Sequence, residues 1–121
     1  MDLHYSNTWA DPGNQQIPKE WSSNSINNLI SDVGQYTKEM MQLIQPDFIQ
    51  LGNEIDGGML WPLGRISDTS NFYSLCRTAA QQTRISNPKT KIIFHISSYK
   101  NADWFFKRLS EQGVSYDIGG V

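Results

Sequence analysis

The sequence predicts an α/β fold with a parallel sheet, and within that class part of a (β/α)8 TIM barrel. Strand-like and helix-like segments alternate along the 121 residues, which is typical of parallel strands joined by right-handed crossovers. Polar side chains stand at the carboxyl ends of the expected strands: His4, then Asn53 with Glu54, then His95. Barrel enzymes build their sites on this rim. A small open doubly wound sheet is the alternative, but the sequence has no glycine-rich nucleotide-binding loop.

The first half of the chain carries local signals for two strands and one helix. Residues 1–6 fit the end of a strand, and a polar loop with the turn signal Asp-Pro-Gly at 11–13 follows. From about residue 22 to residue 45, apolar side chains recur at helical spacing, and Pro46 ends that helix. Residues 47–52 contain few breakers and therefore fit a buried strand.

The second half repeats the pattern. Residues 70–86 form the next apolar stripe of helical type. The branched run at 91–96 predicts another buried strand. A third helix is expected over 101–112, with Asn101 as its N-cap, and residues 116–121 fit the start of a fourth strand. The order is therefore strand, helix, strand, helix, strand, helix, strand.

Composition narrows the classes of function. With 10 basic and 12 acidic residues and no run of either sign, the chain lacks the charge pattern of a nucleic-acid or membrane-surface protein, so neither partner is expected. The single cysteine, Cys76, is expected to be a buried small side chain, and with His4 and His95 it has no metal-ligand spacing. No apolar stretch reaches the roughly 20 residues of a membrane helix, and the N-terminus has no signal-peptide pattern.

The stretch FIQLGNEIDGGMLWP, from Phe48 to Pro62, holds the candidate site. An apolar strand that ends in an amide and a carboxylate, Asn53 and Glu54, places both groups at the open rim formed by the carboxyl ends of the strands. On residue type alone, Glu54 also fits a solvated carboxylate at a strand end, and Asn53 also fits a turn residue.

Three linked stretches closely resemble the endo-β-1,4-galactanases of glycoside hydrolase family 53. They are LHYSNTWADPGNQ at residues 3–15, IQLGNEIDGGMLWPLG at 49–64 and TKIIFHIS at 90–97. The resemblance implies a (β/α)8 barrel that hydrolyses β-1,4-galactan or arabinogalactan of pectin side chains, with retention of configuration, using two glutamates and no cofactor. It also implies that residues 1–121 are a fragment of one catalytic domain, about half of the full barrel, from its third strand to just inside its sixth. The parent enzyme is expected to be secreted.

Within the resemblance, Glu54 matches the family's acid/base glutamate, and Asn53 matches the asparagine that binds the sugar 2-hydroxyl. The nucleophile glutamate of the family lies on its seventh strand and has no counterpart here. We therefore expect the isolated chain to be inactive, which leaves a non-catalytic galactan-binding module or an inert fragment as alternatives. Such a fragment would expose two sheet edges and is expected to self-associate through them.

Four further residues complete the candidate substrate site. Trp9 and Trp61 follow expected strands and fit sugar-stacking platforms or loop anchors. His4 and His95 flank Glu54 on neighbouring strands, where they fit sugar contacts, groups that orient Glu54, or structural histidines. The nearby Asp56 is expected to be a turn residue, although a contact with a sugar hydroxyl is also open.

Overall fold

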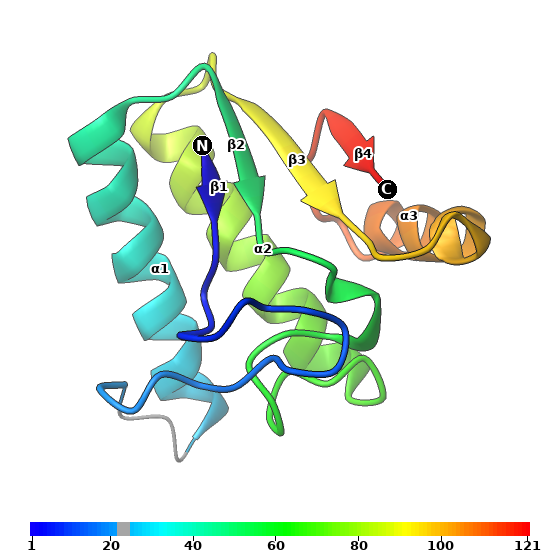
Figure 1. Cartoon of the computed structure of the whole chain (residues 1–121). Coiled ribbons are helices and arrows are strands. Elements are labelled where there is room, and N and C mark those ends of the chain that lie inside the picture. Colours follow the sequence, from blue (N-terminus) through cyan, green and yellow to red (C-terminus); the bar gives the residue numbers. More distant parts are fainter. Residues whose placement is uncertain (22–24) are drawn as a thin grey trace.

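The computed structural model describes residues 1–21 and 25–121. Over these residues it forms one parallel sheet in the order β1-β2-β3-β4, with Asp2–Leu3, Phe48–Leu51, Lys91–His95 and Ile118–Gly120 as its strands. Three α-helices join successive strands: α1 (Ile26–Ile44), α2 (Thr69–Ser86) and α3 (Ala102–Glu111). Short 3-10 turns, η1 (Ile55–Gly57) and η2 (Tyr99–Asn101), follow β2 and β3. This alternation with parallel pairing confirms the predicted α/β class (Figure 1).

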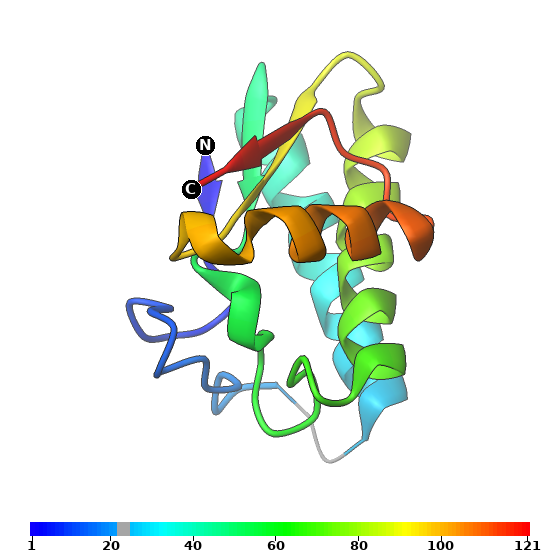
Figure 2. The ribbon, with the colours of Figure 1, turned by 90° about the vertical axis from the view of Figure 1, so that its right-hand side faces the viewer.

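The pleat of the strands separates a covered face from an open face. Successive side chains of a strand point to opposite faces, and one set is fully buried against the helices: Leu3, Ile49, Leu51, Ile92 and Phe94. The other set includes Asp2, Gln50, Lys91 and Ile93, which are exposed or half-buried. Figures 1 and 2 show the helices on one side of the strands. The strands are therefore packed on one face within the described part of the chain.

The first two helices lie where the apolar stripes predict them. Ser25 caps α1 by accepting a hydrogen bond from the backbone N–H of Asn28 at 3.2 Å, so α1 begins later than expected. The predicted start at residues 22–24 lies outside the described residues. Asp68 caps α2 in the same way through the N–H of Asn71. Cys76 of α2 is buried, as predicted, and burial raises the pKa of its thiol far above the ordinary value.

Two element ends differ from the sequence prediction for identifiable reasons. Strand pairing stops after Leu3 and Leu51 because Gly52 takes a φ of 81° and turns out of the sheet. Both strands are therefore shorter than the predicted 1–6 and 47–52. Asn101 occupies the N-cap position of α3, but its side chain makes no capping hydrogen bond. The η2 turn runs directly into α3, and the first helical N–H, that of Ala102, donates to the carbonyl of Tyr99. The Asn101 side-chain amide bonds Asp56 instead.

A carboxylate fastens the other end of the sheet, where the strands begin. Asp117, directly before β4, accepts hydrogen bonds from the N–H of Ile92 at 2.8 Å, from Arg84 at 2.7 Å and from Lys91 at 3.2 Å. These contacts join β3, β4 and α2. The bond from Ile92 and the ion pair with Arg84 hold the pKa of Asp117 at about 2.

In the described part of the chain no helix is long and apolar enough to cross a membrane.

Candidate active site

Glu54 lies at the carboxyl end of β2 in an unusual backbone conformation. Its φ of 50° and ψ of 49° are left-handed, which is uncommon for a residue with a side chain and is often found at functional sites. The backbone N–H of Glu54 donates to Nδ1 of His95 at 3.3 Å. The carboxylate of Glu54 accepts no hydrogen bond from the residues that the structure describes. The side chain is half-buried at the rim of the sheet and is free to meet a bound molecule.

Asn53 is held in place from two sides. Its side-chain Nδ2 donates to the carbonyl of Ala10 at 3.3 Å, and its Oδ1 accepts from Nε2 of Gln50 at 3.3 Å. Both bonds are at the long end of the normal range. The amide is therefore oriented by weak contacts, which a stronger partner such as a sugar hydroxyl can replace.

His4 belongs to a row of polar side chains on the open face of the sheet. Its Nε2 lies 3.0 Å from Oδ2 of Asp2, whose Oδ1 accepts from Nε2 of Gln50 at 2.9 Å. Since Gln50 also reaches Asn53, the row leads from His4 to the amide beside Glu54. His4 itself makes no hydrogen bond with Glu54. Of the two histidines, His95 is in direct contact with Glu54.

The two tryptophans have different surroundings. Trp9 lies in the loop after β1 with 86% of its surface exposed, so a full ring face is available for stacking. Trp61 is half-buried, donates from Nε1 to the carbonyl of Gly57 at 3.2 Å, and carries the guanidinium of Arg65 at 4.2 Å from its ring centre. Its contacts are those of a loop anchor with one face covered.

Gln15, which no sequence pattern indicated as a site residue, organises the loop after β1. Gln15 is 2% exposed, and its Nε2 donates to the carbonyls of Ala10 at 2.8 Å, Asp11 at 3.1 Å and Asn53 at 2.9 Å. Its own carbonyl accepts the N–H of Trp61 at 2.6 Å. A buried glutamine that holds a loop to a strand end has no sequence signature beyond its place in the first matched stretch.

Asp56 is also more than the turn residue that the sequence predicts. It is 9% exposed. Its Oδ1 accepts from the N–H of Ser97 at 3.0 Å, both oxygens accept from Oγ of Ser97, and Oδ2 accepts from Nδ2 of Asn101 at 2.6 Å. Burial acts to raise the pKa of Asp56, but the hydrogen bonds from Ser97 and Asn101 outweigh it and hold the pKa below its ordinary value. Asp56 thereby joins η1 to the loop after β3.

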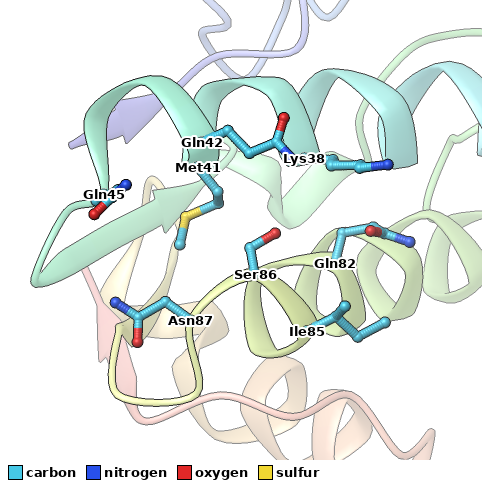
Figure 3. Close-up of a pocket in the computed structure, with 8 residues that line it drawn as sticks. All are labelled: Lys38, Met41, Gln42, Gln45, Gln82, Ile85, Ser86 and Asn87. Carbon is cyan, nitrogen blue, oxygen red and sulfur yellow. The ribbon is translucent and has the colours of Figure 1, made fainter.

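A hollow between α1 and α2 lies at the opposite end of the molecule (Figure 3). It is lined near the carboxyl ends of both helices by Lys38, Met41, Gln42, Gln45, Gln82, Ile85, Ser86 and Asn87. Since these helix ends adjoin the starts of β2 and β3, the hollow is remote from Glu54. The hollow plays no part in the candidate site.

Among the described residues, no group of three or more histidines, cysteines or acids is placed to hold a metal ion.

The site can therefore offer one free carboxylate, an adjacent amide and an exposed aromatic ring. A carboxyl group at such a rim can exchange a proton with a bound hydroxyl or ether oxygen. The structure brings Glu54 together with His95, and Asn53 with the loop that carries Trp9. His4 is linked to Asn53 only through Asp2 and Gln50, and Trp61 only through Gln15.

Comparison with known families gives a match along the whole chain. Residues 1–121 match the model of glycosyl hydrolase family 53. An arabinogalactan endo-β-1,4-galactanase of Humicola insolens is 39% identical over 135 residues, which cover 100% of this chain and 40% of that protein. The enzyme of the same name from Thermothelomyces thermophilus is 35% identical, with the same coverage of each.

Solved structures agree with this match. The Ignisphaera aggregans GH53 catalytic domain superposes with a TM-score of 0.91 at 35% identity, over 98% of this chain and 35% of that one. A structure of fungal β-1,4-galactanases superposes with a TM-score of 0.81 at 35% identity, over 95% of this chain and 37% of that one. The chain thus spans about two fifths of the length of the curated relatives it matches. Its four parallel strands and their helices form part of a (β/α)8 barrel, as predicted.

Proposed function

The chain belongs to glycosyl hydrolase family 53, and we propose on that premise that it forms part of an enzyme that hydrolyses β-1,4-galactosidic bonds within galactan or arabinogalactan. The observation that carries the proposal is the free carboxylate of Glu54, held beside Asn53 on a left-handed backbone at the end of β2. Curated relatives that match the whole chain bear the name of that activity. Since the substrate is a polymer too large to enter a cell, we also propose that the protein acts outside the cell.

In the proposed mechanism Glu54 is the acid/base. As an acid it donates its proton to the oxygen of the leaving sugar, and as a base it then accepts a proton from the attacking water. Asn53 binds the 2-hydroxyl of the sugar at the scissile bond, where such a contact strengthens as charge develops. No cofactor takes part in this chemistry.

Retention of configuration requires a second carboxylate as nucleophile, about 5 Å from the first. Asp56 does not fit this role because its two oxygens are occupied by Ser97 and Asn101. Asp2 is likewise engaged by His4 and Gln50. The family resemblance implies that the nucleophile glutamate belongs to the seventh strand of the barrel. We therefore place it outside these 121 residues and expect the isolated chain to be inactive.

The remaining candidates form the walls of the substrate groove. Trp9 offers an open ring face to the apolar side of a galactose unit. His95 accepts from the N–H of Glu54 through Nδ1, so its Nε2 carries the proton and can donate to a sugar hydroxyl. We place His4 and Trp61 at the edge of the groove.

A galactan-binding module without catalysis is the second candidate for this chain. The exposed ring of Trp9 favours it, since stacking on a sugar does not depend on a second carboxylate. Calorimetry of the 121-residue chain with galacto-oligosaccharides distinguishes this module from an inert fragment. Heat of binding that disappears in Trp9→Ala supports the module.

The test of the enzymatic proposal uses the protein at the full length that its gene encodes. We expect it to release galacto-oligosaccharides from β-1,4-galactan with retention, as seen in the anomer formed first by NMR. Glu54→Gln should lower kcat at least about 1,000-fold without unfolding the protein, because the amide cannot donate the proton. Full activity of Glu54→Gln, or retaining hydrolysis by the 121-residue chain alone, would contradict the assignment.

A further inference from the structure

The loops after β2 and β3 are fastened to each other at two points near Glu54. One is the bond from the N–H of Glu54 to Nδ1 of His95 at 3.3 Å. The other is the cluster of Asp56, Ser97 and Asn101, which we call the rim clamp. Figure 2 shows the η1 turn below α3 near its first turn, and hydrogen bonds from Ser97 and Asn101 to Asp56 join the two segments. Both fastenings act on the four residues from Asn53 to Asp56.

The rim clamp is strong for a contact between two loops. Asp56 is nearly buried and takes hydrogen bonds from a backbone N–H, a hydroxyl and a side-chain amide, at distances from 2.6 to 3.0 Å. Hydrogen bonds to an ionised carboxylate are shorter and stronger than bonds between neutral groups. All of these partners belong to the protein, and the carboxylate has no free side for substrate.

Glu54 needs such support because its own backbone is strained. A left-handed φ of 50° costs a residue with a Cβ free energy and persists when the surrounding structure fixes it. Gln15 fixes the carbonyl of Asn53 on one side at 2.9 Å. The rim clamp fixes η1 on the other side. Without the rim clamp, η1 can rotate and carry the carboxylate of Glu54 away from its position at the rim of the sheet.

We propose that Asp56 is a positioning residue for Glu54, acting through the rim clamp that holds η1 to Ser97 and Asn101. This inference rests on the proposed function for its effect on catalysis, while its structural part can be measured separately. A misplacement of about 1 Å can cost about 100-fold in rate. Loss of the clamp should therefore reduce turnover more than substrate binding.

The kinetic test uses the full-length protein and β-1,4-galactan. We expect Asp56→Ala to lower kcat about 10- to 100-fold with KM changed less than about threefold. The double variant Asp56→Asn/Asn101→Asp exchanges amide and carboxylate across the clamp, so the bond between residues 56 and 101 and the total charge are kept. It should recover most of kcat, whereas Asp56→Asn alone should not.

Two control variants separate positioning from stability. Asp117→Asn removes a carboxylate with similar hydrogen bonds at the opposite end of the sheet, and it should lower stability while kcat stays within about twofold. Lys100→Ala changes an exposed side chain in the same loop as Ser97, and it should alter neither the stability nor kcat. If Asp56→Ala does not fold, Ser97→Ala removes the hydroxyl contacts and keeps the N–H bond, and it should show a smaller fall in kcat.

A spectroscopic measurement tests the clamp without relying on activity. In 15N-labelled protein, Asp56→Ala should shift the Glu54 amide resonance and the Nδ1 resonance of His95, because the bond between them weakens, and the Glu54 amide should exchange faster with solvent. Asp117→Asn should leave these signals unchanged.

The outcomes separate the two proposals. An inactive wild-type protein refutes the proposed function, and the amide signals still decide the role of Asp56. Wild-type kcat and wild-type Glu54 and His95 signals in Asp56→Ala overturn the positioning role. A rise in KM with unchanged kcat also overturns it, because Asp56 would then serve substrate binding.

Discussion

Glu54, the proposed acid/base, lies on a strained backbone. Its carboxylate is free, and its backbone is in a region where the Cβ crowds the following carbonyl. Glycine has no Cβ and adopts this region without cost. We therefore expect that glutamate at position 54 lowers the stability of the folded protein relative to glycine at the same position.

We predict that Glu54→Gly increases the free energy of unfolding by about 0.5 to 1 kcal/mol while it abolishes hydrolysis, because relief of the left-handed strain exceeds the added entropy of the unfolded chain. Urea unfolding of the full-length protein measures the change. Glu39→Gly is the matched control, since Glu39 is in the right-handed backbone of α1, and it should lower stability by about 1 kcal/mol. A destabilised Glu54→Gly variant would show that the backbone at this position is not strained.

Asp117 gives a prediction of pH dependence. Its pKa in the folded protein is about 2, below the ordinary value of about 3.9 for a free aspartate. The stability that it contributes is complete above pH 4 and is lost as the pH falls from about 4 to about 2. Asp117→Asn should therefore lower the free energy of unfolding by about 1 to 2 kcal/mol at pH 7, and the difference from wild type should vanish near pH 2.

The matched control for this experiment is Asp47→Asn. Asp47 precedes β2 as Asp117 precedes β4, but its carboxylate accepts no hydrogen bond in the described part of the chain. Its substitution should leave the profile of stability against pH nearly unchanged. A constant difference between wild type and Asp117→Asn from pH 7 to pH 2 would refute the assigned role of Asp117.

Residues differed in how far the sequence could identify them. Glu54 and Asn53 stand at a strand end in a specific motif, so pattern and resemblance both indicated them. The roles of Gln15 and Asp56 could not be recognised, because the contacts that tie them to neighbouring strand ends, with Asn53 for Gln15 and with Ser97 and Asn101 for Asp56, span 38 to 45 residues of the chain. Asp56 before two glycines has the local pattern of a turn, and its buried contacts depend on how neighbouring strands align.

At the scale of elements, the strands and helices follow from local patterns, but their ends follow from the fold. The apolar stripes of α1 and α2 and the branched run of β3 placed these elements correctly. The strand ends depend on the positive φ of Gly52. The Asn101 side chain bonds Asp56 instead of capping α3, and this depends on the η2 turn before α3. The sequence contains these residues but does not show which conformation they take.

Gly58, in the loop between β2 and α2, has no space for a side chain. A Cβ at this position would lie 2.3 Å from the carbonyl oxygen of Gly64 and 2.5 Å from the nitrogen of Ile66, at a φ of 97°. Gly58→Ala should therefore lower the free energy of unfolding by about 2 to 4 kcal/mol, through backbone strain and a clash with other backbone atoms.

Substitutions at two other glycines separate backbone strain from steric clash as causes of the lost stability. Gly113 has a φ of 71° but open space around it, so Gly113→Ala should cost about 1 kcal/mol from strain alone. Gly13 has neither a left-handed φ nor a close contact, and Gly13→Ala should be nearly neutral. Equal losses at Gly58 and Gly113 would show that the loop yields to the added methyl group.

At the scale of the whole molecule, this part of a barrel has one covered face and one open face. Phe48 and Ile118 are 52% and 39% exposed on the open side, and β1 and β4 have no further strand beside them among the described residues. Unpaired edges and exposed apolar side chains favour association with other chains.

We predict that the 121-residue chain self-associates through this face, and that Phe48→Ser shifts it toward the monomer in analytical ultracentrifugation. Ile85→Ser is the control, because Ile85 is 75% exposed but lines the hollow between α1 and α2 and not the open face of the sheet. It should leave the distribution of species unchanged. A monomeric chain at high concentration, or an equal effect of both substitutions, would exclude the open face as the contact.

The fastening of the rim loops has a consequence for protein engineering. Gln15 joins the loop after β1 to Asn53, and Asp56 joins η1 to the loop after β3. A designer who transplants Glu54 into another barrel with its own loop alone would leave both bracing contacts behind. The loops after β1, β2 and β3 should therefore be transplanted together, along with the strand ends that carry them.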